Sequence, residues 1–207
     1  MDHLLHTENI PPSAITLIGD SAGAHLLLGL VLHISHSNPL VTPLHVDGHF
    51  SNAVLISPWV DMHTSVPSMQ ANKDKDSLTV EALVYWARTF MGITAVDYWN
   101  APLTVPTQWW SDLPVDEILV LYGDNELLKD DTSTFCERLK VHKSHSSQHQ
   151  ENLKLTLCMQ AHHPQTTAWK LPGEIHGHIV LNRFLKINKP CESERIYVKW
   201  MNDHLSS

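Results

Sequence analysis

The sequence contains no apolar run long enough to cross a membrane. Its longest, from Leu26 to Leu32, is far shorter than the roughly 20 residues that a bilayer requires. The start of the chain, from Met1 to Pro12, is polar and lacks the basic flank and apolar centre of a secretory signal. No N-x-[ST] glycosylation acceptor occurs either. These absences lead us to expect a cytoplasmic protein without a membrane span.

Cysteine and basic residues are also scarce. The three cysteines, Cys136, Cys158 and Cys191, are odd in number and widely spaced, which excludes a fold built on a disulfide framework. Only 14 lysines and arginines stand against 22 aspartates and glutamates, giving a net charge of −8. A protein that tracks the phosphates of a nucleic acid needs the opposite balance, so we expect no nucleic-acid partner.

What is present is enough apolar chain for one globular domain. The 207 residues are 43% hydrophobic and 17% charged, which excludes intrinsic disorder and predicts a single domain over residues 1–207. The 16 histidines are unusual, and they keep open the alternative of a His-rich metal protein. However, neither an H-E-x-x-H pattern nor a CxxC pair supports a metal site. The segment 142–151, which holds three of the histidines, is interpreted as a solvated loop. We therefore expect no metal and no cofactor.

Apolar strands alternate with helical patterns along the chain. Near-continuous apolar strands separated by helices predict a mostly parallel sheet flanked by helices, an α/β fold. The expected strands are 13–19, 52–57, 116–122 and 153–159, and the expected helices are 22–34, 78–91, 128–140 and 192–204. Two stretches, 60–77 and 92–114, are irregular. The tryptophans of the second, Trp99, Trp109 and Trp110, are candidates for an apolar substrate wall, or for packing that pins a loop.

The strongest chemical signal is Gly19-Asp20-Ser21-Ala22-Gly23, a G-x-S-x-G pattern between an expected strand and an expected helix. In a nucleophile elbow, a tight turn lifts the serine hydroxyl off the sheet, and the glycines let the chain turn and the helix approach. Ser21 is therefore the candidate nucleophile. The backbone N–H of Ala22, at the helix N-terminus, is the candidate oxyanion donor.

A nucleophile of this kind needs a carboxylate and a histidine later in the chain, in that order. Asp124 follows the third expected strand, at the edge where α/β sheets collect functional groups, and is the preferred acid. Glu126, Asp130 and Asp131 are its rivals, although the last two are also explained as charges at a helix start.

The histidine is expected after the fourth strand. His176, next to Gly177, is preferred as the base over His178. The pair at positions 162 and 163 remains open, although it lies close to the end of the fourth expected strand.

The segments GDSAGAHL, SPWVDM, YGDNELLKDD and GEIHGHI, in this order, resemble the hormone-sensitive-lipase-like branch of the α/β-hydrolases, which includes carboxylesterases and steryl-acetate hydrolases. The resemblance extends from about Pro12 to about Phe184. It implies Ser21 as nucleophile, Asp124 as acid and His176 as base, without a cofactor. His178 stands where the family commonly has phenylalanine.

One family feature does not occur in this sequence. The family's His-Gly-Gly-Gly segment, which supplies further oxyanion donors upstream of the elbow, is missing, and so are the earlier strands. The resemblance therefore implies an N-terminally incomplete α/β-hydrolase domain. By the same resemblance, the first strand would expose an apolar edge, which predicts self-association through that edge or poor solubility.

The sequence thus predicts a serine carboxylester hydrolase that cleaves short-acyl or acetyl esters of a hydrophobic alcohol. Its substrate partner is a small hydrophobic ester. The main alternative is a catalytically impaired remnant of such a hydrolase, kept as an interaction module, since removing one oxyanion donor typically costs about 10²–10³ in turnover.

Overall fold

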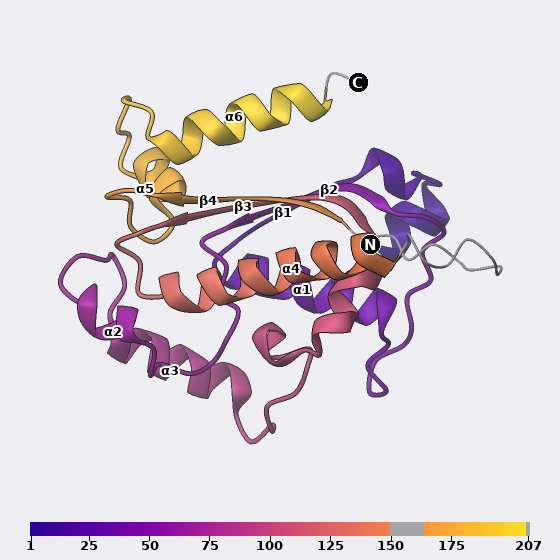
Figure 1. Ribbon diagram of the computed structural model, residues 1–207, viewed down its shortest axis with the longest axis horizontal. Helices are drawn as coiled ribbons and strands as arrows, with labels where there is room; N and C mark the ends of the chain where they lie inside the picture. The colour runs from indigo at the N-terminus through magenta and orange to yellow at the C-terminus, as the bar shows by residue number, and fades with distance from the viewer. Residues whose placement is uncertain (150–163, 206–207) are drawn as a thin grey trace.

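A computed structural model shows a four-stranded, fully parallel sheet in the order β1-β2-β3-β4 (Figure 1). It describes residues 1–149 and 164–205. The strands are β1 Thr16–Asp20, β2 Phe50–Ile56, β3 Val115–Gly123 and β4 Gln165–Leu171. The two central strands are almost entirely buried, which explains their continuous apolar sequence. The predicted α/β class is confirmed.

Helices cover both faces of the sheet (Figure 1). One face packs against α1 and α4 around a core that includes Leu28, Phe50 and Phe135, while α5 and α6 cover the other. Short helices α2 and α3 lie on the side of α1 and α4. The α-helices are α1 Ala22–Ser35, α2 Pro67–Ala71, α3 Val80–Met91, α4 Lys129–His149, α5 His178–Phe184 and α6 Glu192–Leu205. A π-helical turn spans His3–Thr7, and short 3₁₀-helices span Pro12–Ala14, Pro102–Thr104 and Thr107–Asp112.

The register of the sheet gathers the strand ends at one edge. Asp20 pairs with Ile56, Ile56 pairs with Leu121, and Gly123 pairs with Leu171. Because the strands are parallel, the residues that follow them leave the sheet on the same side. The loops that carry the candidate functional residues therefore start next to one another in space, at the same edge of the sheet.

The structure adds one strand and changes two expected segments. Strand β4, at 165–171, is half-exposed and largely polar and was not expected from the sequence, while the expected strand 153–159 lies outside the described residues. The segment expected as a loop from 142 continues α4 as far as His149, since it contains neither glycine nor proline to end a helix. Finally, the irregular stretch 60–77 contains the short helix α2.

Strand β1 pairs with β2 on one side, and no other described strand pairs with its second side. Ile18 in this strand is 50% exposed. The predicted self-association through this edge stays a prediction. None of the helices in the described ranges is both long and apolar enough to cross a membrane.

Candidate active site

Ser21 occupies a strained turn between β1 and α1. Its backbone has φ 50° and ψ −115°, a region that costs a non-glycine residue about 1–3 kcal/mol. The turn is held because the Ser21 N–H donates to the carbonyl of Ile56, while the Ser21 carbonyl accepts from the Trp59 N–H. These bonds attach the elbow to the end of the neighbouring strand β2.

Of the two glycines that flank the elbow, only Gly19 is required by the packing. A Cβ at Gly19 would lie 2.6 Å from both the Ala24 nitrogen and the Gly23 oxygen, so α1 presses directly on β1 there. A Cβ at Gly23 would meet nothing closer than 3.7 Å. Of the two glycines in the G-x-S-x-G pattern, it is therefore Gly19 that allows α1 to approach β1, as the sequence predicted for a glycine here.

The structure brings His176 to Ser21. The Nε2 atom of His176 lies 2.8 Å from the Ser21 Oγ, and the imidazole is 8% exposed. Gly177, with φ 60°, turns the chain directly after the histidine and begins α5. The rival His178 instead accepts a bond at its Nδ1 from the Ile175 N–H, within its own loop. The other rivals, at positions 162 and 163, lie outside the described residues.

The carboxylate beside His176 belongs to Glu126. Its Oε2 lies 3.4 Å from the Nδ1 of His176, and neither atom has a hydrogen-bond partner among the described residues. Glu126 is completely buried. Its other oxygen, Oε1, accepts bonds from the Ser57 hydroxyl at 2.7 Å and from the Gly123 N–H. Oε2 is therefore the Glu126 oxygen that can accept a hydrogen bond from a protonated Nδ1 of His176.

Asp124, the acid preferred from the sequence, is not brought to the imidazole. Its backbone N–H donates to Leu171 and its carbonyl accepts from Asn72, but its half-exposed carboxylate has no partner among the described residues. The physical reason is the turn that follows β3. This turn folds Glu126 back beneath the strand end, where it reaches the Gly123 N–H.

Two residues that the sequence reasoning did not single out support this arrangement. Ser57 directly follows β2 with φ 46°, and its Oγ accepts a hydrogen bond from the Gly177 N–H at 3.0 Å while its hydroxyl donates to Glu126. Gly123 must be glycine, since a Cβ there would lie 2.1 Å from the Glu174 carbonyl oxygen. In the sequence, the available signals for these two roles were a serine and a glycine next to strand ends, and neither residue type at such a position is specific for an active site.

An apolar pocket of about 410 Å³ opens beside Ser21. It is lined by Ser21, Ala22, His25, Leu26, Trp59, Met62, Trp86 and Phe90. The imidazole of His25 is buried, and its Nδ1–H donates a hydrogen bond to the Trp59 carbonyl. Burial lowers the pKa of this imidazole. The side chains that face the Ser21 hydroxyl across this pocket are therefore mainly apolar.

A second hollow of about 320 Å³ shares His25, Leu26 and Phe90 with this pocket and extends along α1 to Trp99. Trp99 is thus the one member of the expected tryptophan wall that approaches the groove. Trp110 is instead buried against Phe135 in the core. Trp109 stacks on His36 and lies beside Trp99, but it lines neither hollow itself.

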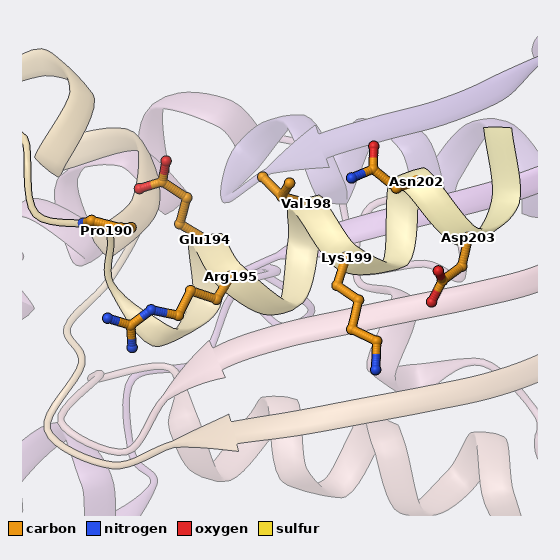
Figure 2. A pocket seen from close by; sticks show the side chains of 7 residues that line it. All are labelled: Pro190, Glu194, Arg195, Val198, Lys199, Asn202 and Asp203. Carbon is orange, nitrogen blue, oxygen red and sulfur yellow. The ribbon is translucent and has the colours of Figure 1, made fainter. Parts of the chain in front are cut away.

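A larger hollow, about 530 Å³, lies on the outer side of α6 (Figure 2). It is lined by residues of mixed character: Pro190, Glu194, Arg195, Val198, Lys199, Asn202 and Asp203. Two of these charges already have partners, because Arg183 pairs with Glu194 and Glu192 pairs with Arg195. The hollow contains none of the residues around Ser21. Among the side chains that the structure describes, in 1–139 and 164–205, no group of three or more histidines, cysteines and carboxylates is arranged to hold a metal ion.

Comparison with known proteins identifies the family of the chain. The profile of the steryl acetyl hydrolase family matches residues 4–170. The chain belongs to the steryl acetyl hydrolase family. An esterase of Acinetobacter venetianus is 30% identical over 147 residues, which cover 67% of this chain and 44% of the esterase. Steryl acetyl hydrolase 1 of Saccharomyces cerevisiae is 26% identical over 125 residues, 55% of this chain and 28% of the yeast protein.

The fold is that of the α/β-hydrolases. The crystal structure of an esterase from the bacterial hormone-sensitive lipase family superimposes with a TM-score of 0.58 and 23% identity, covering 84% of this chain and 48% of the esterase. The resemblance inferred from the four sequence segments is confirmed. This member of the steryl acetyl hydrolase family spans less than half the length of each of these relatives.

Proposed function

We propose that this chain is a carboxylester hydrolase that cleaves short-acyl esters, acetates above all, of a hydrophobic alcohol. One observation carries the proposal: the Ser21 hydroxyl lies 2.8 Å from an imidazole nitrogen at the wall of an apolar pocket. A serine beside a base is the arrangement that activates a hydroxyl for acyl transfer. The family's name makes acetylated sterols the first natural esters to test.

The proposed reaction has two steps. Ser21 Oγ attacks the ester carbonyl carbon while His176 Nε2 accepts its proton, and the tetrahedral oxyanion receives a hydrogen bond from the Ala22 N–H. The intermediate collapses as the alcohol leaves with the proton from Nε2. Water, deprotonated at the same nitrogen, then releases the carboxylic acid from Ser21.

In this proposal Glu126 replaces Asp124 as the acid. When His176 takes the serine proton, its imidazole becomes a cation next to a fully buried carboxylate 3.4 Å away. A charged pair shortens its hydrogen bond and gains strength in a water-poor site, so the contact becomes stronger as the transition state forms. Asp124 has no comparable path to the imidazole.

The pocket supports the choice of substrate. Aromatic and aliphatic side chains surround the nucleophile, and the groove continues along α1 beyond His25. Such a groove accommodates a large apolar group by removing its surface from water, which contributes about 25 cal/mol per Å². The acetyl group needs far less space, and we place it toward the Ala22 N–H.

A fluorophosphonate probe tests the proposal directly, because it reacts with a serine only where a base and an oxyanion site activate it. We expect stoichiometric labelling of the wild-type chain, and none of Ser21→Ala. Ser65→Ala, which changes an exposed serine outside the site, is the matched control and should label fully. Folded wild-type chain that does not label would favour the catalytically impaired alternative.

A further inference from the structure

Beyond the three residues of the proposed reaction, a short segment that follows α2 connects the loops carrying two of them. Residues 72–77, here called the 72–77 segment, contact both the loop after β3, which holds Glu126, and the loop after β4, which holds His176. No residue of the segment lines the pocket beside Ser21. Its contacts with the two loops therefore need an explanation other than substrate binding.

The carboxylate of Asp76 bridges the two loops. Its Oδ1 accepts the backbone N–H of His176 at 2.8 Å, and its Oδ2 accepts the backbone N–H of Leu127 at 2.6 Å. Leu127 is the residue after Glu126. A single side chain thus binds the backbone at the proposed base and beside the proposed acid. Hydrogen bonds from N–H groups to an ionised carboxylate are short and roughly twice as strong as neutral ones.

Its neighbours in the segment reinforce the bridge. The Ser77 hydroxyl donates to the His176 carbonyl at 3.1 Å, so the backbone of the histidine is held at both its N–H and its C=O. On the other loop, the Asn72 amide donates to the carbonyls of Asp124 and Glu126 at 3.0 and 2.8 Å.

The segment is itself anchored at the start of α4. Ser68 in α2 donates two hydrogen bonds there: its N–H donates to the Asp130 carboxylate at 2.8 Å, and its hydroxyl donates to the Leu127 carbonyl at 2.6 Å. Asn72 then closes α2, since its N–H donates to the Ser68 carbonyl. The 72–77 segment is therefore attached, through Ser68, to the start of α4, the helix that follows the loop of Glu126.

We propose that Asp76 is a positioning residue that sets the distance between the His176 Nδ1 and the Glu126 carboxylate. The proposal rests on the reaction proposed above. The Nδ1-to-Oε2 distance, 3.4 Å, joins two side chains on separate loops, and Asp76 is the carboxylate that binds backbone N–H groups of both loops. Without it the loops separate, the imidazole tilts, and Nε2 loses its alignment with Ser21.

The test compares Asp76→Ala, Asp76→Asn and Asp74→Ala. Asp74 is an exposed carboxylate two residues away and serves as the matched control. We expect Asp76→Ala to lower the rate constant of fluorophosphonate labelling by up to about 100-fold, the size of effect that a misplacement of about 1 Å produces. Asp76→Asn keeps one acceptor oxygen and should lie in between. Asp74→Ala should match the wild-type chain.

Two readouts separate positioning from simple loss of folding. The final labelling stoichiometry should stay that of the wild-type chain, and with p-nitrophenyl acetate kcat should fall while KM is unchanged, because Asp76 does not line the pocket. A variant that is merely unfolded would instead lose stoichiometry with an unchanged rate constant for the folded fraction. That result, or equal rates for Asp76→Ala and Asp74→Ala, would overturn the proposal.

Amide hydrogen exchange, read by mass spectrometry, tests the bridge without using activity. We expect faster exchange over 124–128 and 173–178 in Asp76→Ala but not in Asp74→Ala, because these loops lose the acceptor of the Leu127 and His176 N–H groups. Unchanged exchange would overturn the bridge even if the wild-type chain is reactive. Conversely, a wild-type chain that does not label, with the exchange difference present, would refute the proposed reaction and leave the bridge standing.

Discussion

The two sides of Ser21 are built differently. On the side of β3 and β4, hydrogen bonds connect the loop after β3, the loop after β4 and Ser57 at the end of β2. On the side of α1 and α3, the surface is apolar and open, and Leu26, Trp86 and Phe90 are 64%, 45% and 51% exposed. We call these the bonded side and the open side.

The two sides suit two different functions, proton transfer and the binding of an apolar group. Proton transfer demands atoms fixed to a fraction of an ångström, which a network of buried hydrogen bonds provides. Binding an apolar group demands area rather than fixed geometry, and exposed aliphatic and aromatic side chains provide it. Substitutions on the bonded side should therefore change kcat, and substitutions on the open side should change KM.

The largest effect is expected at Glu126, the proposed acid. Glu126→Gln keeps the shape but removes the charge that faces His176 Nδ1, so we expect kcat with p-nitrophenyl acetate to fall on the order of 10³–10⁴-fold. Asp124→Asn is the matched control, since only the backbone of Asp124 is bonded, and it should leave kcat unchanged. A large loss in Asp124→Asn with little in Glu126→Gln would return the role to Asp124.

A smaller effect is expected on the open side. Trp86→Ala removes an aromatic wall of the pocket and should raise KM for long-chain p-nitrophenyl esters about tenfold, with kcat little changed, through lost apolar contact. Tyr85→Ala removes the neighbouring aromatic, which is 66% exposed and does not line the pocket, and should leave both constants unchanged. If Trp86→Ala lowers kcat instead, the division between the two sides fails.

The smallest effect concerns a carboxylate near the bonded side. Asp131, at the start of α4, is buried, and its Oδ2 has no hydrogen-bond partner in the described residues. Burial, together with the charges of Asp61 and Asp130, raises its pKa from 3.8 to about 7, against an opposing contribution from His63. The folded chain therefore holds a proton between about pH 4 and 7 that the unfolded chain has released.

It follows from the sign of this shift that Asp131 makes the fold less stable as pH rises through that window. Asp131→Asn cannot ionise, so its Tm at pH 8 should exceed that of the wild-type chain by a few degrees, with a smaller gain or none at pH 5. A change of 1 kcal/mol corresponds to about 2–4 °C in a chain of this size. Asp74→Asn, an exposed change, should show no such pH dependence when measured by thermal unfolding.

How much the sequence could predict depended on whether the signal was local. The elbow at Ser21 was predictable because strand, turn glycine and helix all lie within a few residues, and His176 because a glycine follows it. The carboxylate beside His176 was not predictable, because several carboxylates follow β3 closely and only the path of the turn decides that Glu126 faces inward. Spacing alone favoured Asp124, the first of them after the strand.

The supporting residues were harder still to predict. Asp76 binds partners 51 and 100 positions away, and Ser57 binds partners 69 and 120 positions away, so no window of sequence contains both ends of these contacts. Strand β4 was missed for a different reason. It is polar and half-exposed, and lacks the apolar pattern by which the other strands were recognised.

The long separations in sequence also determine when the site can exist. Ser21 and His176 are 155 positions apart, so the elbow leaves the ribosome long before its proposed base has been synthesised. Contacts between such distant residues form late and slow the folding of a domain. Reactivity of Ser21 toward an active-site probe would then appear only after the β4 loop has docked. A time course of labelling during refolding would report the last step of assembly rather than the first collapse.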